Sequence, residues 1–211
     1  MLAACVHKGY PVSEYLSPES PCQKDILREL AAMCGIVPGR IHLGVDGCSA
    51  PAHALPRRNM ALGFARLANP GGLEGGQRRA CEAIFAAVNK RPEMISGTGG
   101  SCSDLIRESR GKLIGKVGAE GVYCVGIKGR GLGFAVKIES GSMAVLPPVV
   151  LRMLDALRVL DPEELTAVER YRRMEVRNDN DRLVGHEEAA YQAGVSRLRV
   201  SRCAARRGRL E

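Results

Sequence analysis

The stretch from Lys112 to Glu139, "KLIGKVGAEGVYCVGIKGRGLGFAVKIE", decides the fold class of this chain. Its three apolar segments cover residues 112–118, 121–128 and 131–139, and glycine-containing breaks separate them. Short apolar segments with turn residues between them are typical of strands joined by hairpins. The stretch therefore predicts an antiparallel meander of three strands.

Apolar residues recur at helical spacing on both sides of this meander. The segment "SPESPCQKDILRELAAMCG" predicts a helix capped by Ser20, with Pro21 in its first turn and Gln23 as the capping-box partner. Gly35 is expected to end this helix. Further helices are expected over residues 57–68, 76–92, 147–160 and 161–165. Helices followed by consecutive strands and then by helices indicate an α+β fold, an antiparallel sheet flanked by helices.

The composition is that of a globular chain with one sizeable core, since 45% of its 211 residues are hydrophobic. The sequence contains no apolar run of about 18 residues, and no basic segment precedes its short apolar start. We therefore expect neither a membrane partner nor a signal peptide, and we predict a cytoplasmic location. The eight cysteines follow no disulfide framework and include no CxxC, so reduced thiols are expected.

The net charge of +8 is concentrated at the C-terminal end. Residues 194–211 hold six Arg and one Glu and so contribute +5, which leaves the rest nearly balanced. Because aromatic residues make up only 4%, we expect no nucleic-acid partner. The pattern predicts one domain over residues 1–185 and a basic tail over 186–211, whose composition fits a disordered or frame-shifted end.

Two glycine-rich motifs lie in or just before the meander. "KVGAEG", beginning at Lys116, has the form of the K-T-G signature, in which the lysine lies on the strand that borders the active site. Gly118 would let a substrate lie close to that strand, although an ordinary surface lysine is the alternative. In "SGTGGSCSD", consecutive glycines can direct backbone N–H groups toward an anion, with hydroxyls from Thr98 and Ser101. The alternative is a flexible loop.

Cys48 and Cys102 each lie in a glycine-rich segment that we expect to be a loop, two residues from an aspartate. Two thiolates from separate loops could hold Zn²⁺, with His53, His42 or water completing the coordination. Unclustered cysteines are more often buried and inert. Cys48 with His53 is also a candidate nucleophile and base, although five residues in a proline-containing loop do not guarantee contact.

Ser109 and Lys112 satisfy the pattern S-x-x-K. In the enzymes that use this pattern, a helical turn brings the lysine amine to the serine hydroxyl. Here the pair lies on the approach to a strand, so we interpret the match as coincidence.

Three segments in this order, "VDGCSAPAHALP", "MISGTGGSCSDL" and "GKVGAEGVYCVGIKGRGLGFAVKI", resemble the rhizobial-type L-asparaginases, also called thermolabile or class 3. The resemblance covers residues 1–185 and implies a serine β-lactamase/glutaminase-like fold. It implies hydrolysis of the side-chain amide of L-asparagine to aspartate and ammonia, by an amidohydrolase with a lysine-activated serine nucleophile. A homodimer is left open.

The resemblance also implies roles for individual residues. It makes Cys48 and Cys102 ligands of a zinc ion near the substrate, and it places Lys116 in the catalytic site, where it meets the substrate carboxylate or aids proton transfer. The expected substrate-binding residues are Thr98, Gly99 and Gly118.

Two departures qualify this expectation. The family carries its S-x-x-K serine, and a second motif C-S-G-K-H-A-G-M, before the point that matches Met1, so we expect an N-terminally truncated chain without its nucleophile. Some members bind zinc through a lysine near the first cysteine, but no lysine lies between Lys24 and Lys90. The alternative functions are a non-catalytic relic or regulator that binds zinc or asparagine, and a cysteine-dependent amidohydrolase that uses Cys48 with His53.

Overall fold

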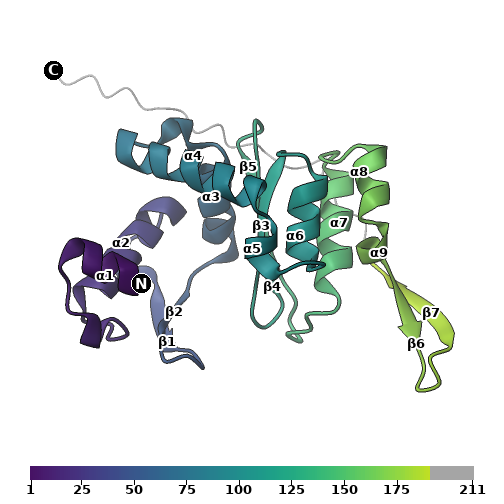
Figure 1. The fold of residues 1–211 in the computed structure, drawn as a ribbon, viewed down its shortest axis with the longest axis horizontal. Helices are drawn as coiled ribbons and strands as arrows, with labels where there is room; N and C mark the ends of the chain where they lie inside the picture. Colours follow the sequence, from purple (N-terminus) through teal and green to yellow (C-terminus); the bar gives the residue numbers. More distant parts are fainter. Residues whose placement is uncertain (191–211) are drawn as a thin grey trace. The chain divides into compact units, whose positions relative to one another are not determined.

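A computed structural model describes residues 1–190 of the chain. They divide into two compact units, Met1–Gly63 and a second unit that begins at Phe64. The boundary falls inside helix α3 (Arg57–Ala68). Figure 1 labels the helices and strands along the chain.

The first unit contains helices and one hairpin. Its elements are α1 (Leu2–Lys8), η1 (Val12–Glu14), α2 (Pro21–Cys34), η2 (Pro38–Arg40), β1 (His42–Val45), β2 (Pro51–Ala54) and the start of α3. Helix α2 has the predicted ends: the Ser20 side chain accepts a hydrogen bond from the backbone N–H of Gln23, and Gly35 ends the helix with φ 62°. The capping box is only half formed, because the Gln23 side chain donates to the Tyr15 carbonyl instead, at 2.7 Å.

The second unit contains the meander and the helices around it. Its elements are η3 (Pro70–Gly72), α4 (Gly75–Lys90), α5 (Glu93–Ser96), α6 (Ser101–Glu108), β3 (Leu113–Gly118), β4 (Val122–Ile127), β5 (Leu132–Lys137), α7 (Leu146–Ala156), α8 (Pro162–Ala167), α9 (Glu169–Arg172), β6 (Arg173–Arg177) and β7 (Leu183–Glu188). The predicted α+β order is confirmed, with antiparallel strands in the order β3-β4-β5.

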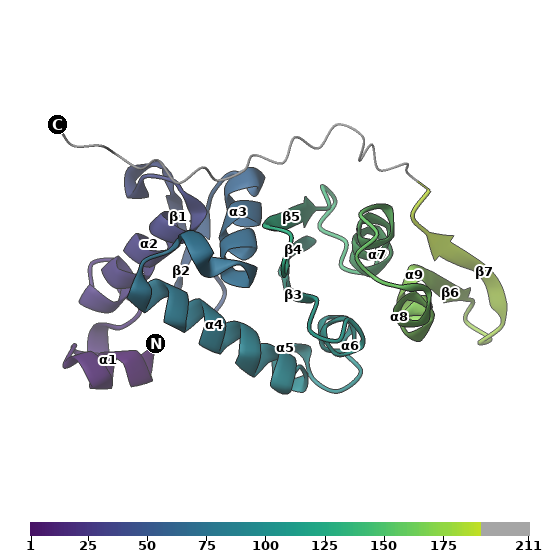
Figure 2. The ribbon, with the colours of Figure 1, turned by 90° about the horizontal axis from the view of Figure 1, so that it is seen from above.

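The two faces of this sheet pack against different helices (Figure 2). One face contributes Leu113, Tyr123 and Val125 to the main core, which α6 and α7 complete. The opposite face contributes Ile114, which packs with Phe85 of α4 and the end of α3. This alternation follows from the period of two in a strand, which sends successive side chains to opposite faces.

Gly126 of β4 shows why a glycine is required at one point of close packing. A methyl group at Gly126 would lie 2.1 Å from the backbone oxygen of Phe64 and 3.0 Å from Cβ of Ala68. Only a residue without a side chain allows α3 to approach the strand backbone so closely.

One local prediction differs from the structure. The segment from Gly44 to Pro56 is not an irregular loop but the larger part of a hairpin, in which His42 pairs with Ala54 and Leu43 with His53. The domain end at residue 185 stays a prediction, and residue 185 itself lies in strand β7. The part of the predicted tail beyond residue 190 lies outside the described residues.

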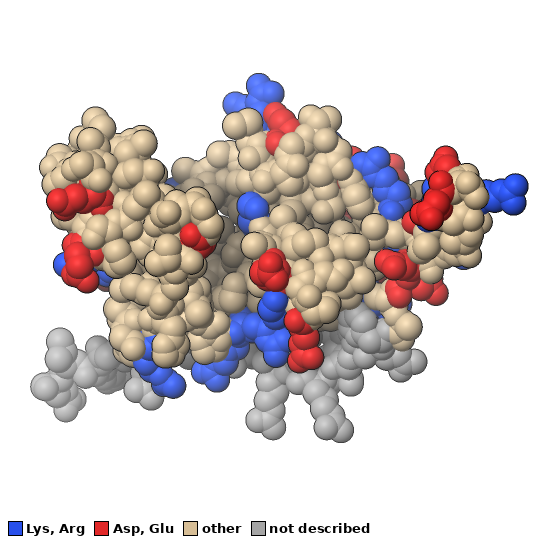
Figure 3. Space-filling model, turned by 90° about the horizontal axis from the view of Figure 1, so that it is seen from below, with Lys and Arg blue, Asp and Glu red and all other residues tan. Residues whose placement is uncertain are grey.

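The surface of the described part carries charges of both signs. Figure 3 shows Lys and Arg interspersed with Asp and Glu on one face, as the nearly balanced charge of the chain body predicts. Among the described helices, none combines the length and the apolar character needed to cross a membrane.

Candidate active site

The outer edge of strand β3 brings two of the sequence motifs together at Val117. The backbone N–H of Val117 donates a hydrogen bond to Sγ of Cys102 at 3.3 Å. The carbonyl oxygen of Val117 accepts a hydrogen bond from Nζ of Lys116 at 2.6 Å. Because β3 is an outer strand, alternate residues turn their backbone N–H and C=O groups away from β4. The Cys102 thiol and the Lys116 ammonium group therefore meet the same exposed peptide edge.

Cys102 lies in the first turn of helix α6, so the prediction that it lies in a loop is wrong. Its side chain is fully buried, in the main core. Gly100 is the last of the glycines before Cys102, and it is the N-terminal cap of α6. The helix that follows has an apolar face. The helix thus begins one residue before the cysteine and carries its thiol to the sheet edge.

Lys116 is exposed on β3, opposite Cys124 of β4. Among the described residues, no carboxylate pairs with its ammonium group. A positive charge without a counter-ion at a sheet edge can meet an anionic ligand, and the catalytic role of Lys116 stays a prediction.

The glycine-rich loop between α5 and α6 has an alternating backbone conformation. Gly97 and Gly99 have φ of 80° and 76°, whereas Gly100 has φ of −72°. Within the described part of the chain, the backbone N–H groups of Thr98 and Gly99 have no hydrogen-bond partner, and both residues are exposed. Alternation of this kind directs successive N–H groups to one side, which suits an anion. The predicted binding residue Gly118 is half-buried at the end of β3, opposite Val122.

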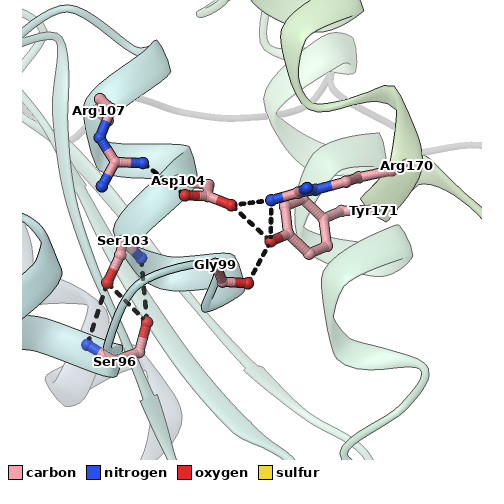
Figure 4. Close-up of polar contacts among 7 residues, drawn as sticks. All are labelled: Ser96, Gly99, Ser103, Asp104, Arg107, Arg170 and Tyr171. Atoms are coloured by element: carbon pink, nitrogen blue, oxygen red, sulfur yellow. Dashed lines mark hydrogen bonds and ion pairs between the residues drawn. The ribbon is translucent and has the colours of Figure 1, made fainter.

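Two sets of hydrogen bonds hold this loop (Figure 4). At its start, the Ser96 hydroxyl accepts from the Ser103 backbone N–H at 3.1 Å, and the Ser103 hydroxyl accepts from the Ser96 N–H at 3.2 Å. At its end, the hydroxyl of Tyr171 lies 2.7 Å from the Gly99 carbonyl oxygen and also 2.7 Å from the Asp104 carboxylate. The loop is therefore anchored to α6 and to the distant helix α9.

The Asp104 carboxylate is the common acceptor in the second set of hydrogen bonds, at the end of the loop. It accepts hydrogen bonds from Arg107 at 2.5 Å, from Arg170 and from Tyr171. Burial raises the pKa of Asp104, but the hydrogen bonds from Tyr171, Arg107 and Arg170 outweigh it and leave the pKa below its ordinary value. Arg170 also lies over the Tyr171 ring, 4.7 Å from its centroid.

Sequence reasoning missed Arg170 and Tyr171. They follow Asp104 by 66 and 67 positions and belong to no local motif, so only the fold brings them to the loop. Asp104 itself stands out in the sequence as an acidic residue beside Cys102.

Cys48 lies in the first unit, in the turn of the β1–β2 hairpin, and is exposed. Its thiol and its backbone N–H both hydrogen-bond to Asp46, and they hold the pKa of that carboxyl group below its ordinary value. Asp46 also accepts from the Ala50 N–H at 3.1 Å, which closes the turn. His53 is on strand β2, and no hydrogen bond joins it to Cys48 within the described hairpin. A Cys48–His53 catalytic pair stays a prediction.

The described residues do not fit a zinc centre by themselves. Across residues 1–190, no three His, Cys, Asp or Glu side chains gather in a group that could hold a metal ion. The Cys102 thiol is engaged by a backbone N–H, and Cys48 belongs to the other compact unit. Zinc binding by these two cysteines stays a prediction, and no chemical step is assigned to a metal.

The Ser109 and Lys112 side chains have different partners. The Ser109 hydroxyl is buried and donates to the Ile106 carbonyl at 2.8 Å. The Lys112 ammonium group binds Glu164 at 2.5 Å and Asp161 at 3.1 Å. These contacts agree with the interpretation that the S-x-x-K match is coincidental.

Comparison with known families agrees with the three motifs. The family model described as L-asparaginase II matches residues 1–189, which include the glycine-rich loop, Cys102 and the β3 edge. No curated protein matches the chain. The resemblance inferred from the motifs is confirmed, and the chain belongs to the L-asparaginase II family.

Proposed function

We propose that the outer edge of β3 forms part of the substrate site of an L-asparaginase, which hydrolyses the side-chain amide of asparagine to aspartate and ammonia. The family match supports asparaginase-type amidohydrolase chemistry. The arrangement of the three-stranded sheet between helices supports a serine β-lactamase/glutaminase-like fold.

One observation carries this proposal: the backbone of Val117 joins the two motifs. Its N–H binds Cys102, next to the glycine-rich loop, and its C=O binds Lys116 of the K-V-G motif. A ligand at this edge can meet the Lys116 ammonium group, which pairs with no carboxylate among the described residues, and the exposed backbone N–H groups of the loop.

The chemistry of asparagine suits these groups. Its α-carboxylate is an anion that an ammonium group and convergent N–H groups bind, and its side-chain amide needs room near the strand. Lys116 then binds the carboxylate or moves a proton, Thr98 and Gly99 supply N–H groups, and Gly118 leaves space beside the strand. The nucleophile is not assigned to any of these residues.

Calorimetry with L-asparagine, together with an assay of ammonia release, tests the proposal. The chain is expected to bind L-asparagine, and Lys116→Ala is expected to weaken binding at least about tenfold, as loss of a charged hydrogen bond does. Lys90→Ala is the matched control, since Lys90 is an exposed lysine at the end of α4.

The two measurements separate the alternatives. Binding with ammonia release supports an asparaginase, whereas binding without release supports a non-catalytic protein that retains the ligand site. If L-asparagine does not bind, or if Lys116→Ala binds it as well as Lys90→Ala does, the proposed site is wrong.

A further inference from the structure

The Tyr171 hydroxyl is the one side-chain group described as hydrogen-bonding to the backbone of loop residues 97–100 from outside α5 and α6. It reaches the Gly99 carbonyl from helix α9, 72 positions further along the chain. The Ser96–Ser103 contacts fix the start of the loop but do not touch Gly99. Tyr171 therefore supplies the shorter of the two described hydrogen bonds that hold the peptide between Gly99 and Gly100, the other being from the Gly100 N–H to the Gly97 carbonyl at 3.3 Å.

The Tyr171 hydroxyl has one proton but two hydrogen-bond acceptors close to it. A phenol has one proton to donate, and two acceptors compete for it, the Gly99 carbonyl and the Asp104 carboxylate. Asp104 also receives hydrogen bonds from Arg107 and Arg170, so the Tyr171 proton is shared between the Asp104 carboxylate and the Gly99 carbonyl. Arg170 also donates to the Tyr171 oxygen at 2.9 Å, which polarises the O–H group and strengthens its bond to the carbonyl.

The Tyr171 contact helps to hold the neighbouring peptide groups. Gly99 lies at φ 76°, a conformation that glycine leaves readily because no Cβ restricts it. The peptide plane between Gly99 and Gly100 has two described hydrogen bonds, from Tyr171 to the Gly99 carbonyl at 2.7 Å and from the Gly100 N–H to the Gly97 carbonyl at 3.3 Å, so loss of the first leaves only the longer one. With this weaker restraint the dihedral angles of Gly99 can vary more, and the two preceding peptide planes, which carry the N–H groups of Gly99 and Thr98, are held less firmly.

We propose that Tyr171, held by Asp104 and Arg170, is a positioning residue that fixes the glycine-rich loop so that its N–H groups meet the α-carboxylate of the substrate. This inference rests on the proposed function, because it names how that site recognises its substrate. Tyr171 itself does not touch the reacting amide. Tyr171 holds the N–H groups of the loop in place before the substrate binds. Binding then loses no affinity to the ordering of these donors.

Tyr171→Phe tests the proposal, since it removes the hydroxyl and keeps the ring. Hydrogen exchange of the loop amides is expected to become faster, and the affinity for L-asparagine is expected to fall about three- to tenfold, the effect of one hydrogen bond. Where ammonia release is measurable, KM is expected to rise by the same factor while kcat stays constant. Arg172→Gln, on the same helix but paired with Glu169, is the control and is expected to change neither quantity.

L-Asparaginamide distinguishes positioning from a general structural effect, because a neutral amide replaces the α-carboxylate. Tyr171→Phe is expected to weaken L-asparagine binding more than L-asparaginamide binding. An equal loss for both ligands, or faster loop exchange with unchanged L-asparagine affinity, would contradict the positioning role.

The measurements also distinguish a failure of the proposed function from a failure of the inference about Tyr171. If the unmodified chain does not bind L-asparagine, the substrate assignment is wrong, and the exchange measurement still tests the contact between Tyr171 and the loop. If Tyr171→Phe changes neither exchange nor affinity, the inference is overturned while the proposed function stands.

Discussion

The thiol of Cys102 accepts a hydrogen bond from the backbone N–H of Val117 at 3.3 Å, across 15 positions of sequence. An outer strand presents unpaired N–H and C=O groups, which proteins commonly protect. At this point of β3 the protection comes from a buried cysteine side chain rather than from another strand. The same contact places the start of α6 against the K-V-G motif.

Cys102→Ala is expected to destabilise the chain more than Cys81→Ala. Both cysteines are buried, and both changes remove a sulfur atom, but only Cys102 accepts a described backbone hydrogen bond. The unpaired N–H of Val117 is expected to add about 1–3 kcal/mol to the loss of unfolding free energy. Urea unfolding of the two variants gives the difference, and equal losses would show that the sulfur contact contributes nothing.

Gly126→Ala is expected to lower the unfolding free energy by at least about 3 kcal/mol, because its Cβ would collide with the Phe64 carbonyl oxygen. Gly76→Ala is the control. Gly76 lies in helix α4 with no atom within 4 Å of an added Cβ, so alanine is expected to stabilise the helix by up to about 1 kcal/mol. Thermal unfolding measures both variants, and a tolerated Gly126→Ala would disprove the close packing of α3 on β4.

Lys112→Met is expected to destabilise the second unit by about 3–5 kcal/mol, because it leaves the buried Glu164 carboxylate without its 2.5 Å ion-pair partner. Glu164 also accepts from the Asp161 backbone N–H at 2.9 Å, within the capping box of α8. The double variant Lys112→Met/Glu164→Gln is expected to regain about half of the loss, since the amide oxygen can keep that bond. A double variant no more stable than Lys112→Met would argue against an uncompensated charge as the cause.

The stability of the first unit is expected to fall in acid through Asp25. Its pKa is lowered to about 2 by hydrogen bonds from Lys8 and Tyr10, and by Arg28. Because the folded-state pKa lies below the ordinary value of 3.8, the stabilisation is fully present above that value and is lost as the pH falls toward about 2. Hydrogen exchange of the α2 amides should show Asp25→Asn less protected than the unmodified chain near neutral pH.

The difference between these two proteins should shrink as the pH falls from 3.8 toward about 2, where half of Asp25 is protonated, and disappear below that pH, where both carry a neutral group at position 25. A constant difference at every pH would mean that Asp25 acts by shape rather than by charge. Glu29→Gln is a suitable comparison on the same helix, because Glu29 is an exposed carboxylate whose oxygen lies 3.8 Å from the Arg28 side chain.

Local sequence signals determined the α+β order, the meander, the ends of α2 and the family. The structural signals act within a few positions: Ser20 caps α2 through the N–H of a residue three positions later, and short apolar segments between glycine-containing turns define β3, β4 and β5. The family was indicated by three such segments taken together. The same signals misplaced Cys102, because the glycines before it gave no indication that Gly100 caps a helix. They also hid the β1–β2 hairpin, because glycine and proline are unusual in strands.

Only the tertiary structure decided which distant groups meet. The sequence marked Lys116, Cys102 and the glycine-rich loop, but their meeting at the backbone of Val117 requires α6 to pack along the edge of β3. No local motif indicates that Tyr171 reaches Gly99, because a hydrogen bond between residues 72 positions apart depends on how the core folds. Local propensity acts over a few residues, whereas burial of a common core sets long-range contacts, and the candidate site is made of such contacts.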